Sequence, residues 1–139
     1  MSNAATDYLE NRTLDFWLNG NSLTTTSPSN LYVALFTGTA ATVLANIEGG
    51  TFSDEITLGS YARTAVTFGS ASSGSIANDA NVTFPTATGN YDGTVTVLAV
   101  MDATTSGNAL FAGELTQAKT VTTGDTFQVA TSNLAVSLT

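Results

Sequence analysis

The chain has 139 residues, of which 42% are hydrophobic and only 10% are charged, so it is long enough for one domain with a real core. It contains no cysteine and no histidine, which excludes disulfides, thiolate nucleophiles, Ser-His-Asp triads and the ordinary zinc sites. Its net charge of −8 argues against direct contact with nucleic acid or an anionic membrane, and without the required apolar runs we expect neither a signal peptide nor a membrane span.

The first expected element is a helix from about Thr6 to Asn19. Leu14, Trp17 and Leu18 fall at positions i, i+3 and i+4 and give this helix one apolar stripe. Gly20 follows as a C-terminal stop signal. An apolar stripe on a short helix has to be buried somewhere, within the domain or on a partner.

From Leu31 onward the pattern changes to short β-type runs separated by clusters of Gly, Asn, Ser, Thr and Asp. Leu31–Phe36 is apolar almost throughout, which predicts a strand buried on both faces. Further runs of apolar or alternating residues predict strands at 61–68, 82–84, 94–101, 110–115, 127–129 and 134–138. About seven or eight strands is the number that a two-sheet sandwich needs.

These runs predict an all-β fold, a jelly-roll-like antiparallel β-sandwich with one short N-terminal α-helix. We expect residues 1–20 to form an arm with that helix and residues 21–139 to form the sandwich domain. The segment from Gly38 to Ser60 is long for a connection and contains Gly49-Gly50, so it is expected to be a loop over the domain or an arm reaching a neighbour. No internal repeat is found, which argues against a fibrous shaft.

Four residues are candidates for an interface with another subunit: Leu14, Phe16, Trp17 and Arg63. Trp17, with Phe16 beside it, fits a core, an interface anchor or a sugar-stacking platform, and a helix that precedes a sandwich favours core or interface. Arg63 is one of only three cations. We expect it to pair with a carboxylate, either within the domain or on a neighbouring subunit.

Carboxylates are the remaining candidates for chemistry. The sequence offers the residue type of a glycoside hydrolase pair at Asp54, Glu55, Asp92, Asp102 and Glu114. Most of them adjoin Gly, Ser or Asn in expected turns, where an aspartate bonds to nearby backbone amides. The ligand spacing of an EF-hand is absent. We therefore expect no catalytic residues, no metal site and no cofactor.

The order of several segments resembles a family of small tailed-phage virion proteins, described as tail-fibre-like, some of them similar to capsid decoration or cement proteins. The resemblance covers most of the chain and departs from the family between Thr37 and Gly59, where a shorter, Gly-rich connection is expected. It rests on these segments in order: Tyr8–Asn11, Leu31–Thr37, Gly59–Arg63, Thr64–Phe68, Asn81–Thr88, Gly107–Gly113 and Lys119–Asp125.

This resemblance implies a non-enzymatic structural protein of the virion. The first expectation is a capsid decoration or cement protein that binds the major capsid protein on the outer capsid surface, because a compact acidic domain without a shaft suits an outward position. The alternative is a tail or tail-fibre component or a receptor-binding tip in contact with tail proteins, and a carbohydrate-binding or carbohydrate-active module comes third. We also expect a homo-oligomer, assembled in the host cytoplasm, without nucleic-acid or membrane contacts.

Overall fold

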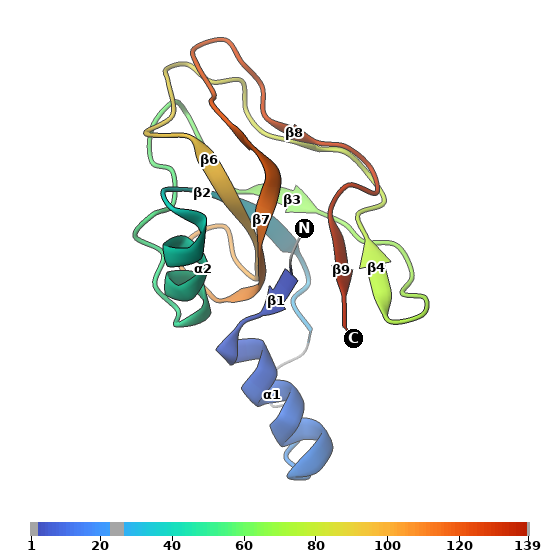
Figure 1. The fold of residues 1–139 in the computed structure, drawn as a ribbon. Coiled ribbons are helices and arrows are strands. Elements are labelled where there is room, and N and C mark those ends of the chain that lie inside the picture. Colours follow the sequence, from blue (N-terminus) through green and yellow to red (C-terminus); the bar gives the residue numbers. More distant parts are fainter. Residues whose placement is uncertain (1–2, 23–26, 139) are drawn as a thin grey trace.

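Strands dominate the computed structural model, which describes residues 3–22 and 27–138. All its strand pairs are antiparallel, which confirms the expected all-β class, while the jelly-roll arrangement and the division at residue 20 stay predictions. The elements follow the chain in the order β1 (Asn3–Ala5), α1 (Asp7–Leu18), β2 (Leu31–Thr37), α2 (Ala40–Glu48), β3 (Thr64–Val66), β4 (Ser75–Ala77), β5 (Val82–Thr83), β6 (Val95–Met101), β7 (Ala109–Lys119), β8 (Gln128–Val129) and β9 (Ala135–Ser137) (Figure 1).

One five-stranded sheet in the order β1-β7-β6-β2-β3 organises the fold. Its centre is β6, which pairs with β2 on one side and β7 on the other and is buried along nearly its whole length. Two further ladders, β4 with β9 and β5 with β8, have two strands each. Of these, the β5-β8 ladder contributes Val82 and Val129 to the apolar cluster on one face of the large sheet.

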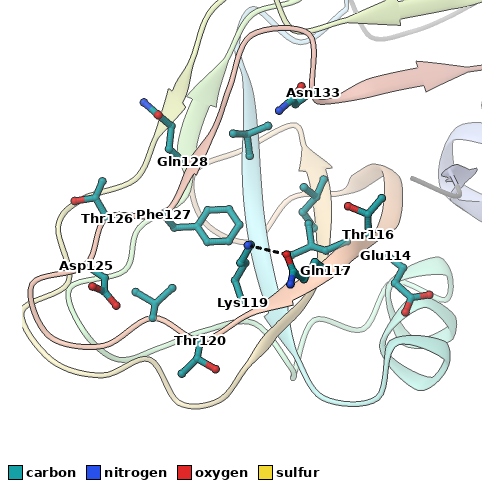
Figure 2. A pocket seen from close by; sticks show the side chains of 14 residues that line it. Glu114, Thr116, Gln117, Lys119, Thr120, Asp125, Thr126, Phe127, Gln128 and Asn133 are labelled. Atoms are coloured by element: carbon teal, nitrogen blue, oxygen red, sulfur yellow. Dashed lines mark hydrogen bonds between the residues drawn. The ribbon is translucent and has the colours of Figure 1, made fainter.

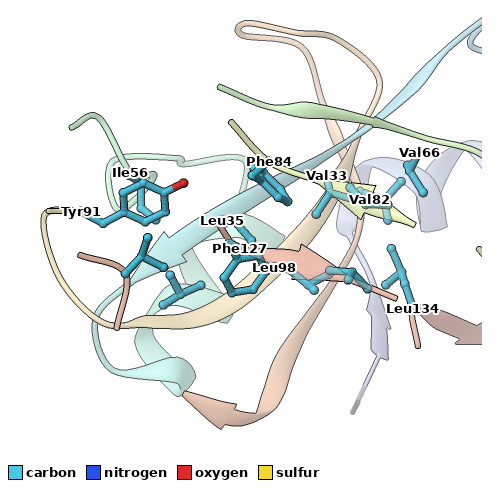
Figure 3. Close-up of a cluster of buried hydrophobic side chains, with 14 of the residues drawn as sticks. Val33, Leu35, Ile56, Val66, Val82, Phe84, Tyr91, Leu98, Phe127 and Leu134 are labelled. Atoms are coloured by element: carbon cyan, nitrogen blue, oxygen red, sulfur yellow. The ribbon is translucent and has the colours of Figure 1, made fainter. Parts of the chain in front are cut away.

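The core has two parts because both faces of the sheet are covered. In β2, Val33 and Leu35 point into the larger cluster, together with Phe84 and Phe127 from the covering strands and loops (Figure 3). The alternate residues of β2 belong to a second cluster on the opposite face. This explains why Val33–Phe36 is completely buried, as its continuous apolar character predicts.

A second helix, α2, covers that opposite face. Val43 and Ile47, one turn apart, are buried in the same cluster as Phe36 and Met101. The expectation of a loop or arm across 38–60 is therefore wrong for Ala40–Glu48. The helix forms because its apolar side chains recur with a helical period and pack together against the apolar face of the sheet.

The N-terminal segment is attached at the edge of the sheet. β1 pairs with β7, and the buried Thr6 donates hydrogen bonds from its backbone N–H to the carbonyl of Leu110 (3.0 Å) and from its hydroxyl to the carbonyl of Ala109 (2.5 Å). α1 starts directly after this anchor, within the range expected for the helix, and leads away from the sheet (Figure 1). No residue of α1 is buried.

Candidate functional site

The apolar end of α1 is exposed. Its large side chains have exposed fractions of 54% for Leu14, 38% for Phe16, 74% for Trp17 and 81% for Leu18. We call these four residues the helix tip. The rings of Phe16 and Trp17 meet edge to face with their centroids 5.0 Å apart. Of the roles open to Trp17 from the sequence, burial in the core of its own chain is thus excluded, and its role in an interface stays a prediction.

Arg63 is no part of the helix tip. It belongs to a hydrogen-bond network within its own chain. Its Nε and Nη2 donate to the two carboxylate oxygens of Glu55, each at 2.7 Å, and its Nη1 donates to the carbonyls of Ala103 (2.9 Å) and Ser106 (2.7 Å). The bond to Glu55 raises the pKa of Arg63 above its ordinary value. The side chain of Arg63 is only 5% exposed, so the expected carboxylate partner is within the chain.

Tyr61 belongs to the same network. Its hydroxyl donates to Oε1 of Glu55 (2.9 Å) and accepts the backbone N–H of Leu35 (3.0 Å). Burial is the main reason that the pKa of Tyr61 is raised well above its ordinary value, and the neighbouring carboxylate adds to this effect. The phenol is therefore a neutral hydrogen-bond donor that ties Glu55 to the sheet.

The aspartates considered as catalytic candidates accept hydrogen bonds from other groups of the chain. Asp92 accepts hydrogen bonds from the backbone N–H (3.3 Å) and hydroxyl (2.8 Å) of Thr57. Asp102 accepts the backbone N–H (2.7 Å) and the side-chain amide (2.9 Å) of Asn108. The bonds of Asp102 are the local turn bonds that the neighbouring residues predict, whereas those of Asp92 join two segments that lie 35 residues apart in the sequence. Across residues 3–22 and 27–138, no group of three or more acidic side chains is placed to hold a metal ion.

A cleft of about 570 Å³ opens between β7 and the stretch 125–133 (Figure 2). Its inner wall includes Phe127, whose ring points into the cleft but is 92% covered, and so is no open platform for a sugar. Gln117 accepts a hydrogen bond from Lys119 (3.2 Å) on the rim. Glu114 and Asp125 lie at opposite ends, an arrangement unlike two carboxylates that flank one scissile bond.

A second hollow, which we call the apolar groove, has a volume of about 320 Å³ and a wall without a single charged side chain. Sequence reasoning missed it, because five separate segments meet there only through the sheet topology. Leu138, at the end of the run 134–138 in which apolar and polar residues alternate, is 67% exposed at this groove. The main contributors to the wall are Leu31, Phe68, Ile76, Phe111, Val136 and Leu138.

A family model described as podophage GP4 fiber I protein gp80 matches residues 4–137. The matched range contains both helices and eight complete strands, so it extends over the whole fold and includes the helix tip and most of the apolar groove. No curated protein matches the chain. Within the part of the chain that the structure describes, no helix has the length and apolar character needed to cross a membrane.

Proposed function

Because the chain belongs to the family described as podophage GP4 fiber I protein gp80, and is thus a phage virion structural protein, we propose that it is a tail-fiber component. The family description carries this proposal, since its match covers residues 4–137. It favours the fiber over the outer capsid surface, which was the first expectation from the sequence. The fiber component contacts other virion proteins and acts without catalysis.

The exposed helix tip supports a role in assembly. A soluble monomer rarely exposes a cluster of large apolar side chains, and such clusters mark surfaces that other proteins cover. Trp17 is suited to an anchor, because it offers a large contact area with few rotatable bonds. The low charge of the chain adds to this, since short Thr, Ser and Asn side chains lose little conformational entropy when a partner covers them.

The state of the acidic residues supports a role without catalysis. Glu55 accepts hydrogen bonds from Arg63 and Tyr61, Asp92 is bonded to Thr57, and Asp102 is bonded to Asn108. A general acid or base needs a proton-transfer group that faces a substrate and not a structural partner. A capsid decoration role remains the second candidate, favoured by the net charge of −8 and the lack of a repeat along the chain.

Labelling of intact particles tests this proposal. Purified phage is incubated with gold-coupled antibodies raised against the isolated chain and is imaged by electron microscopy. We expect gold at the fibers. The control is the same antibody saturated beforehand with purified chain, which removes specific labelling. Gold spread over the shell supports the decoration role instead, and unlabelled particles that also lack the chain on immunoblots show that it is no part of the virion.

A further inference from the structure

We propose that the Asn19-Gly20 bond is a site of spontaneous deamidation in the folded chain. Asn19 is the C-cap of α1 and directly follows Leu18, the last residue of the helix tip. The reaction converts its neutral side chain into a carboxylate, so the net charge of the chain becomes one unit more negative than −8. This chemistry is a property of the chain itself and does not depend on its place in the particle.

The reaction needs water as its only co-reactant. The backbone nitrogen of Gly20 attacks the side-chain carbonyl carbon of Asn19, and the amide nitrogen of that side chain leaves as ammonia with the proton that Gly20 gives up. The product is a five-membered succinimide ring. Water opens the ring at its side-chain carbonyl to give aspartate, or at its backbone carbonyl to give isoaspartate, in which the main chain runs through the former side chain.

The sequence provides this pair of residues once. Asparagine is among the thermolabile residue types, and Asn19 is the only asparagine of the chain that a glycine follows. A glycine leaves the attack on its predecessor least hindered, because no Cβ lies beside the attacking nitrogen and the backbone can rotate freely into the required geometry.

The end of α1 leaves both reacting groups open. Asn19 and Gly20 are exposed, and a Cβ added to Gly20, whose φ is +69°, would meet no atom within 4 Å. The N–H groups of Asn19 and Asn21 both donate to the carbonyl of Asp15 at 3.2 Å. Within residues 3–22 and 27–138, neither the N–H of Gly20 between them nor the side-chain amide of Asn19 has a hydrogen-bond partner.

Asparagines elsewhere in the chain are held by their side chains. The amide of Asn46 donates to Asp54 (2.9 Å), and that of Asn108 donates to Asp102 (2.9 Å). Such bonds restrict the rotation that brings the side-chain carbon to the next backbone nitrogen. The fold therefore adds to the preference that the sequence of Asn19 sets.

Asp92-Gly93 shows the opposite case, because it can close the same ring in its aspartate form. The carboxylate of Asp92 accepts hydrogen bonds from the backbone N–H (3.3 Å) and the hydroxyl (2.8 Å) of Thr57. A Cβ at Gly93 would lie 3.0 Å from the Cβ of Thr37, so this glycine is packed against another segment. The folded chain thus protects Asp92-Gly93 and leaves Asn19-Gly20 open.

Deamidation changes the end of the helix. A carboxylate at residue 19 is unfavourable there, because the C-terminal end of a helix already carries partial negative charge. Isoaspartate also adds one carbon to the main chain, so we expect the last turn of α1 to lose helix. A partner that covers the helix tip then meets a charge beside Leu18, a consequence that alone rests on the proposed assembly role.

Peptide mapping by mass spectrometry detects the reaction. The folded chain is incubated in a mildly alkaline buffer made with heavy-oxygen water and is then digested. We expect conversion at Asn19, with one heavy oxygen in each product and more isoaspartate than aspartate. Asn21, exposed in the same segment but followed by serine, is the internal reference. Conversion at Asn21 that equals or exceeds that at Asn19 overturns the proposal.

Three variants test the assignment. Asn19→Gln keeps the amide but needs a six-membered ring, and Gly20→Ala places a methyl group beside the attacking nitrogen, so both should lose most of the product. Asn21→Gln is the matched control and should react like the wild type. Circular dichroism verifies that all three are folded. Isoaspartate that forms undiminished in Asn19→Gln shows that the assignment is wrong.

A comparison of folded and unfolded chains tests the role of the structure. We expect Asn19 to react in buffer at nearly the rate that it shows in urea, because α1 ends without protecting it. Asp92-Gly93 should form isoaspartate in urea only, since unfolding removes its bonds to Thr57. If Asn19 stays intact in the folded chain and reacts only in urea, the end of the helix protects it and the proposal fails.

Discussion

At the scale of single residues, the segment Gly59-Ser-Tyr-Ala-Arg63 has a structural role. Gly59 has a φ of +72°, and a Cβ at this position would collide with the carbonyl oxygen of Gly89. Tyr61 and Arg63 then share the carboxylate of Glu55. One tight turn therefore places both donors on one partly buried acceptor, a requirement of packing and not of catalysis.

The hydroxyl of Tyr61 should contribute measurably to stability. Tyr61→Phe leaves the N–H of Leu35 and one oxygen of Glu55 without this partner, and we expect the free energy of unfolding at pH 7 to fall by ~1–3 kcal/mol. Because burial raises the pKa of Tyr61 in the folded state, its contribution is complete below the unfolded pKa of ~10 and is lost as the pH rises above it. Denaturant unfolding between pH 7 and pH 11 measures both effects, and the alkaline loss should be smaller in the variant.

Tyr91 is the matched control for this change. Its hydroxyl is buried, and no hydrogen-bond partner for it exists among the described residues. Tyr91→Phe removes a polar atom that burial only penalises, so we expect little loss or a small gain in stability. Equal destabilisation by the two variants would contradict the role given to the Tyr61 network.

At the scale of elements, α2 should stabilise the fold through the face that it covers. Ile47→Ala opens a cavity between the helix and the sheet, and we expect the free energy of unfolding to fall by ~2–5 kcal/mol. Thr42→Ala, on the exposed side of the same helix, should change it by no more than ~0.5 kcal/mol. Chemical denaturation of both variants measures this difference, and a small effect of Ile47→Ala would mean that α2 is only loosely attached.

The sequence predicted the strands better than the connections, for a physical reason. Val66, Val82 and Phe127 are buried as their runs indicate, because alternation along a strand is local information. α2 was missed although Val43 and Ile47 carry the helical period, since glycines flank the segment and its β-branched residues lower its helix propensity. Its stability comes from the sheet that it covers, and that contact is not local.

The features of the candidate site also differ in how far local sequence patterns predict them. Exposure of an apolar stripe on α1 was one of two outcomes that the helical period left open, and the structure decides between them for Leu14, Trp17 and Leu18. The pairing of Arg63 was predictable in kind because a buried guanidinium needs a carboxylate, but its partner Glu55 is set by the fold. The apolar groove depends on strand register, which the sequence does not display.

At the scale of the whole molecule, the large sheet is covered on both faces, and the N-terminal helix α1 adds no side chain to either part of the core. The attachment consists of β1 and Thr6, and α1 has no buried residue. Removal of the helix tip and removal of the complete arm should therefore have different consequences, which distinguishes an assembly element from a cap on the fold.

Two variants of the arm test this difference. In the tip variant, Leu14, Trp17 and Leu18 are each replaced by Ala, which preserves helix propensity, and the second variant lacks residues 1–20. We expect the tip variant to keep the wild-type midpoint of thermal unfolding, because no buried apolar area is lost. The deletion should lower the free energy of unfolding by at least ~1–3 kcal/mol, since Thr6 no longer satisfies the carbonyls at the start of β7. A tip variant that melts as early as the deletion would show that α1 stabilises its own domain.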